Sequence, residues 1–109
     1  MSASQRRKGA NGEREIVNLH KAQGIHAERV VMSGAIKGRR MGDGHDVDIY
    51  ARGTHAAPMV CEVKRGKQVP KFITDALGDN DALFMRRDRE DWVVVLPMRT
   101  WFELVKARA

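Results

Sequence analysis

The chain lacks the features that mark several classes of protein. Its 109 residues contain one cysteine, Cys61, so no intrachain disulfide can form and a cysteine-rich zinc site is excluded. No apolar run approaches the roughly 18 residues that a membrane-spanning helix needs, and no signal-peptide pattern opens the chain. We therefore expect a cytoplasmic protein without a membrane partner, in which Cys61 is a small buried hydrophobic residue.

Acidic residues are scarce in the first part of the chain. Residues 1–40 contain nine Lys and Arg against three Asp and Glu, whereas residues 41–109 contain eleven of each kind, so the formal charge of +6 lies entirely in residues 1–40. A localised basic excess is typical of a protein that binds a polyanion, most often nucleic acid. The alternative is a solubilising face together with a disordered tail.

Hydrophobic spacing and turn residues predict eight elements in the order α-β-β-β-α-β-β-α. Glu13 and Glu15 suit the first turn of an opening helix, and Thr100 and Glu103 have the spacing of a capping box in the closing helix. This order predicts an α/β fold with one mixed sheet of about five strands flanked by helices. The helices are expected at 11–24, 70–78 and 99–109, and the strands at 25–32, within a hairpin over 46–66, and at 82–87 and 92–97.

The chain is too short for two hydrophobic cores. We expect residues 1–10 to form a flexible basic arm and residues 11–109 to form a single domain. Residues 33–45, "SGAIKGRRMGDGH", contain four glycines and three basic residues, which predicts a mobile loop that reaches for a polyanion.

The predicted hairpin carries charges where a buried strand would hold valines. If its turn centres near His55, Asp48 lies opposite Glu62, and Lys64 points to the same face because strand side chains alternate. Two facing carboxylates repel each other unless a cation binds between them, and Mg²⁺ or Mn²⁺ prefers such oxygen ligands. The alternative is a solvated strand face on which Lys64 neutralises its neighbours.

The hairpin resembles the PD-(D/E)xK nuclease superfamily. The motif aspartate corresponds to Asp48 in "VDIYA", and the Glu-x-Lys element corresponds to Glu62 and Lys64 in "CEVKRG". Val47 occupies the place of the proline that usually precedes the aspartate. Asp46, on the same face as Asp48, is an alternative or auxiliary ligand. The resemblance implies a restriction-endonuclease-like core.

Residues 6–34, "RRKGANGEREIVNLHKAQGIHAERVVMSG", resemble the opening of the archaeal-type Holliday-junction resolvases. This resemblance covers roughly residues 6–68 and implies that Glu13 and Ser33 join the active site. Residues 34–45 are an insertion relative to the compact family form. Alternatively, Glu13 interacts with the helix dipole and Ser33 is only a loop hydroxyl.

The two resemblances together imply a metal-dependent, structure-selective DNA endonuclease, a junction resolvase that acts as a homodimer on four-way junctions. The metal ligands would be Asp48, Glu62, the Val63 carbonyl and Glu13, with Lys64 orienting the attacking water or stabilising charge. Two alternatives are a VRR-type or restriction-like nuclease that cuts flaps or duplex DNA, and a non-catalytic nucleic-acid-binding module. The expected DNA contacts are Arg6, Arg7, Lys8, Arg14, Lys37, Arg39, Arg40 and Lys67.

The remaining histidines and aromatic residues are assigned no chemistry. The four histidines have no metal-ligand spacing and are expected at the surface or in turns; they are His20, His26, His45 and His55. The large aromatic residues are expected in a core or a dimer interface rather than as platforms for bases; they are Phe84, Trp92, Trp101 and Phe102.

Overall fold

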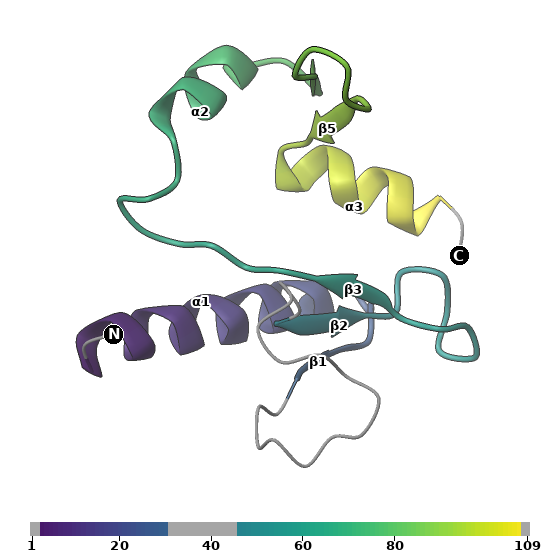
Figure 1. Ribbon diagram of the computed structural model, residues 1–109. Coiled ribbons are helices and arrows are strands. Elements are labelled where there is room, and N and C mark those ends of the chain that lie inside the picture. The colour runs from purple at the N-terminus through teal and green to yellow at the C-terminus, as the bar shows by residue number, and fades with distance from the viewer. Residues whose placement is uncertain (1–2, 31–45, 108–109) are drawn as a thin grey trace. The chain divides into compact units, whose positions relative to one another are not determined.

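The computed structural model describes residues 3–30 and 46–107 and divides the chain into two compact units, residues 1–68 and 69–109 (Figure 1). The order of helices and strands is the predicted one. The eight elements are α1 (Ala3–Ala22), β1 (Ala27–Arg29), β2 (Val47–Ile49), β3 (Met59–Cys61), α2 (Lys71–Leu77), β4 (Leu83–Met85), β5 (Val93–Val95) and α3 (Met98–Lys106).

The two units do not by themselves decide how many functional domains the chain has. One nuclease domain over 11–109, behind an arm at 1–10, stays a prediction. Among the described residues, no helix combines the length and the apolar composition that crossing a membrane requires.

The opening helix begins earlier than predicted. α1 starts at Ala3 rather than near residue 11, so its first turn contains no acidic residue. Glu13 therefore lies in the middle of the helix, and its assignment to a helix N-terminus is wrong. The predicted stop is confirmed, because α1 ends at Ala22 and Gly24 follows with φ of +77°, a conformation that glycine adopts without strain.

The first unit is an antiparallel three-stranded sheet, in the order β1-β2-β3, with α1 packed on it. Its buried core contains Val17 of α1 together with Ala27, Val47 and Ile49 of the sheet. His20 is also buried, with Nδ1 2.7 Å from the Ile16 carbonyl oxygen, so the expected surface position of this histidine is wrong.

The register of the β2–β3 hairpin differs from the prediction by two residues. Val47 pairs with Cys61 and Asp48 pairs with Val60, so Asp48 does not lie directly opposite Glu62. A shift of two residues keeps every side chain on its predicted face, because strand side chains alternate with a period of two. The apolar pattern therefore cannot distinguish the two registers.

The second unit contains α2, the β4–β5 hairpin and α3. Pro70 and Gly78 flank α2 at the predicted positions. In the hairpin, Leu83 pairs with Val95 and Met85 pairs with Val93 in an antiparallel two-stranded sheet. The expected α/β composition is confirmed. The described strand pairs are all antiparallel and form two small sheets, so one mixed sheet of about five strands is not shown.

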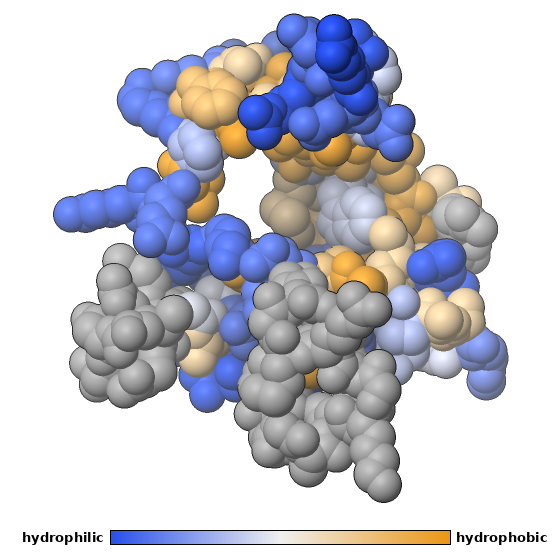
Figure 2. Space-filling view, in the orientation of Figure 1, coloured by the Kyte–Doolittle hydropathy of each residue, from blue (hydrophilic) through white to orange (hydrophobic). Residues whose placement is uncertain are grey.

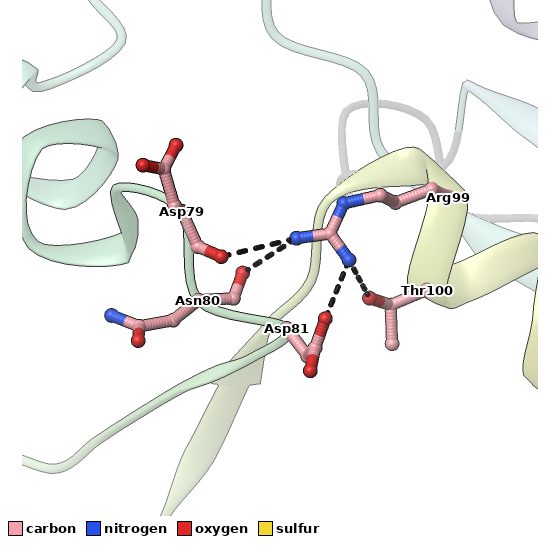
Figure 3. Close-up of polar contacts among 5 residues, drawn as sticks. All are labelled: Asp79, Asn80, Asp81, Arg99 and Thr100. Carbon is pink, nitrogen blue, oxygen red and sulfur yellow. Dashed lines mark hydrogen bonds and ion pairs between the residues drawn. The ribbon is translucent and has the colours of Figure 1, made fainter.

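Arg99 ties the start of α3 to the connection between α2 and β4 (Figure 3). Its guanidinium donates to Asp81 Oδ1 at 2.5 Å and to the carbonyl oxygens of Asp79 and Asn80 at 3.3 and 3.1 Å. The predicted capping box is wrong. Thr100 lies inside the helix, whose N-cap is Pro97 and has no side-chain hydrogen bond.

Large hydrophobic side chains reach the surface of the second unit (Figure 2). Phe84 and Val94 face each other across the hairpin and are 67% and 50% exposed, and Trp92 is 64% exposed beneath the Arg86 guanidinium. The prediction that Phe84 and Trp92 lie in the core is therefore wrong. A dimer interface on these residues stays a prediction.

Candidate functional site

The candidate site lies where the chain leaves β3. Asp46 comes immediately before β2, and its backbone N–H donates to the Cys61 carbonyl oxygen at 2.8 Å. A continuation of the strand register, in which Val47 pairs with Cys61, would have placed Asp46 opposite Glu62. The pairing thus slips by one residue, as at a β-bulge, and Glu62 lies just beyond the end of the strand.

The side chain of Asp46 holds the chain in this position. Its Oδ2 accepts a hydrogen bond from the backbone N–H of Val63 at 2.8 Å. A carboxylate that accepts from a backbone N–H makes one of the stronger hydrogen bonds in proteins. Asp46 therefore anchors the backbone midway between Glu62 and Lys64, the two residues of the Glu-x-Lys element.

Glu62 and Lys64 form an ion pair, with 2.9 Å between Lys64 Nζ and Glu62 Oε1. The hydrogen bond that Lys64 donates to Glu62 raises the pKa of Lys64 above its ordinary value, and the charges of Glu62 and Asp46 act in the same direction. Lys64 is therefore a cation at neutral pH. Both side chains are largely exposed, so a substrate can reach them.

We expect the pKa of Lys64 to fall when Glu62 is replaced by glutamine. The variant removes the charge of Glu62 and weakens its hydrogen bond, which are the two largest causes of the rise. Side-chain NMR of lysine across a pH titration measures this change. Glu103→Gln, which changes an exposed carboxylate of α3 and leaves Glu62 in place, is the control, and in it Lys64 should titrate as in the wild type. An unchanged Lys64 titration in Glu62→Gln would show that the ion pair does not form in solution.

Asp48 differs from the other carboxylates because it is almost fully buried, with 4% of its surface exposed. It lies in the central strand, between Glu28 of β1 and Val60 of β3. Burial raises the pKa of the Cys61 thiol, and the charge of Asp48 raises it further. Cys61 is therefore a protonated, half-buried side chain, in keeping with its expected inert role.

Glu13 does not join the carboxylates in this structure. Its Oε1 lies 3.0 Å from Arg29 Nε, so α1 and β1 are linked by an ion pair at this point. The neighbouring Gly12 is buried, and a Cβ on it would lie 3.6 Å from Val63 Cγ1. α1 therefore passes close to the candidate site, while the Glu13 carboxylate is engaged with Arg29.

For the other predicted site residues, the structure gives only an exposed position or a place in the backbone, or does not describe them. Ser33 and the loop cations Lys37, Arg39 and Arg40 lie outside the described residues, as does His45. Arg14 is exposed on α1, and Lys67 is exposed in the turn that follows the Glu-x-Lys element. The basic residues of the predicted arm fall within the backbone of α1; they are Arg6, Arg7 and Lys8.

The donors at this site suit a hard divalent cation. Asp48, Glu62 and the Val63 carbonyl supply oxygen atoms only, and Mg²⁺ commonly takes one or two carboxylates and keeps several waters. In the described part of the chain, no three side chains of His, Cys, Asp or Glu are grouped closely enough to hold a metal by themselves. An ion at these residues would therefore also need ligands from water or substrate.

The sequence pattern identified Asp46 only as a possible ligand and did not predict its bond to Val63. Nor did it predict the partner of Glu13, because Arg29 is 16 residues away along the chain. The signal available for Asp46 was its separation of two residues from Asp48. Which backbone group it contacts depends on the slip in strand pairing, which the residue types do not encode.

Comparison with known families gave a match that spans most of the chain. The model of the family described as "Phage putative PDDEXK endonuclease" matches residues 4–108. The comparisons with curated proteins and with solved structures gave no match.

Proposed function

The chain belongs to this family of PDDEXK endonucleases, and from that premise we propose that it hydrolyses phosphodiester bonds of DNA with the help of a divalent metal ion. The observation that carries the proposal is the Glu-x-Lys element. The Glu62–Lys64 ion pair is accessible, and Asp46 anchors the backbone between its two residues. Asp48 lies on the adjacent strand.

Asp48, Glu62 and the Val63 carbonyl would hold the ion, which we propose to be Mg²⁺ or Mn²⁺. A bound divalent ion supplies an activated water and stabilises negative charge on the phosphate. One carboxylate oxygen of Glu62 contacts Lys64, so the carboxylate can still coordinate a metal ion. Glu13 would contribute only after its carboxylate leaves Arg29, and we assign it the position of a second ion or of an ordered water.

Lys64 supplies the positive charge that the reaction requires from the protein. It is exposed and remains protonated at neutral pH. One of its three N–H groups is donated to Glu62, so the other two can orient the attacking water and contact a phosphate oxygen. Charge that develops on the phosphate is then stabilised by a group already in place before the reaction, which is an efficient form of catalysis.

We further propose that the substrate is a branched DNA, with a four-way junction as the preferred form. The excess of positive charge in residues 1–40 supports phosphate contacts, which provide affinity without reading base sequence. A homodimer with two-fold symmetry would present two metal sites and two basic surfaces, which matches the symmetry of a junction. Ser33, Lys37, Arg39 and Arg40 belong to this proposal through the sequence alone.

A panel of DNA substrates tests the proposal. In Mg²⁺, we expect tighter binding to a four-way junction than to linear duplex of equal length, and paired symmetric nicks near the crossover. Equal cutting of junction and linear DNA by a monomeric protein would contradict junction selectivity and favour the simpler nuclease. Binding without any cleavage in Mg²⁺ or Mn²⁺ would contradict the nuclease itself and favour the non-catalytic module.

A further inference from the structure

A groove runs between α1 and β1 on the first unit, on the side of the helix that carries Arg14. The helix contributes Arg14, Asn18 and Lys21 to its walls, and β1 with the residue before it contributes His26, Glu28 and Arg29. Its apolar floor is formed by Val17 and Ala27, which belong to the buried core. The groove is therefore built by elements that the fold holds together.

The helix side of the groove is a continuous polar stripe. Arg14, Asn18 and Lys21 are separated by four and three residues, which places them above one another on one face of a helix. At a rise of about 1.5 Å per residue, Arg14 and Lys21 lie about 10 Å apart along the helix axis. Consecutive phosphates of one strand rise by about 3.4 Å along the duplex axis and also turn around it, so a stripe of this length can reach at least two neighbouring phosphates.

The charge of the groove favours an anion. Three of its lining side chains are Lys or Arg, and Glu28 is the one lining carboxylate. Glu28 is already engaged, since its Oε1 lies 2.7 Å from His26 Nε2. Arg29 is partly neutralised by Glu13. Arg14 donates to Asn11 Oδ1 at 3.3 Å, a neutral partner that leaves its charge uncompensated.

The groove and the candidate site both adjoin α1. A Cβ on Gly12 would lie 3.4 Å from Arg65 and 3.6 Å from Val63, and Gly12 is about half a turn around the helix from Arg14. A DNA that occupies the groove and the Glu-x-Lys element together therefore has to extend across the width of α1, roughly 10–12 Å with its side chains.

We propose that this groove binds the sugar–phosphate backbone of the DNA substrate, with Arg14 and Lys21 contacting phosphates and Asn18 donating to an oxygen between them. The proposal rests on the proposed function, because it extends the DNA path away from the same site. It adds Lys21, Asn18 and Arg29 to the DNA contacts expected from the sequence, and it places them on a folded surface rather than on the loop or the arm.

The test is a salt titration of binding to a fluorescein-labelled linear duplex, measured by anisotropy in EDTA so that metal-dependent cleavage plays no part. Lys21→Ala and Arg14→Ala should each weaken binding and reduce the slope of log K against log [salt] by about 0.9, with about twice that reduction in the double variant. Lys21→Arg should retain the wild-type slope, because it keeps the charge at the same place.

Arg52→Ala is the matched control, since Arg52 is an exposed cation of the same unit in the connection between β2 and β3. Its slope should equal that of the wild type. Unchanged slopes in both groove variants, with circular dichroism showing that they are folded, would overturn the proposal. An equal reduction of the salt slope in Arg52→Ala would also overturn it, as would the absence of DNA binding by the wild type. Cleavage by the wild type in Mg²⁺ is a separate readout, so the groove and the nuclease can fail independently.

Discussion

Replacing Glu62 with glutamine should reduce DNA cleavage by at least about 100-fold, the loss that removal of even an outer-shell partner of a metal can cause. The substitution removes the negatively charged oxygen that we propose as a metal ligand and keeps the shape of the side chain. DNA affinity and its salt dependence should stay near those of the wild type, because Glu62 contacts no phosphate and counterion release is unaffected. Glu62 is exposed, so the fold should also be retained.

Two measurements check this expectation, namely single-turnover cleavage in Mg²⁺ and binding in EDTA. Glu103→Gln is the matched control, since Glu103 is an exposed carboxylate on α3 in the second unit. It should cut at the wild-type rate. A Glu62→Gln protein that cuts as fast as the wild type would remove Glu62 from the site and leave the Glu-x-Lys element as an ordinary surface ion pair.

Changing the two aspartates of the hairpin should separate a metal ligand from a positioning residue. Asp48→Asn should lose cleavage to the same extent as Glu62→Gln, because it removes the charge of the second carboxylate that we propose as a metal ligand. Asp46→Asn should lose less, because an amide oxygen can still accept the hydrogen bond from the Val63 N–H, although a neutral acceptor binds more weakly. The alanine of Asp46→Ala cannot accept that bond, so the cleavage rate of this variant should lie between those of Asp46→Asn and Asp48→Asn.

The readouts for this series are cleavage rate, thermal unfolding and DNA affinity. Asp48 is buried, so the melting temperature of Asp48→Asn shows whether lost activity reflects lost structure. Asp48→Glu, which keeps the charge but moves it, serves as a second variant at this position. If Asp46→Asn is as inactive as Asp48→Asn while remaining folded, then Asp46 is itself a ligand, and its bond to Val63 is not its main role.

The sequence was sufficient to predict elements whose ends carry local signals. α2 lies between Pro70 and Gly78 as expected, because proline fixes the backbone angle of a helix start and glycine permits its end. The β4–β5 hairpin also follows from local alternation around the polar turn at residues 88–91. The start of α1 was missed because its first turn contains no acidic residue and because the basic run at residues 6–8 was interpreted as part of a flexible arm.

Features that depend on distant contacts were predicted less well. The hairpin register was wrong by two residues because both registers place the same side chains on the same face. The arrangement in two sheets was not predicted, because an apolar run indicates a strand without specifying its partner. The burial of Asp48 could not be foreseen, since an aspartate is rarely buried and only the packing around the central strand determines its exposure.

The most direct test of the central claim is metal add-back to wild-type protein that has been stripped with a chelator. Cleavage of a four-way junction should be absent in EDTA, should return when Mg²⁺ or Mn²⁺ is supplied in excess, and should not return in an identically prepared Glu62→Gln protein. That result would establish a metal-dependent nuclease whose activity requires the Glu-x-Lys element. Cleavage that persists in EDTA, or that the Glu62→Gln protein recovers in full, would contradict the account.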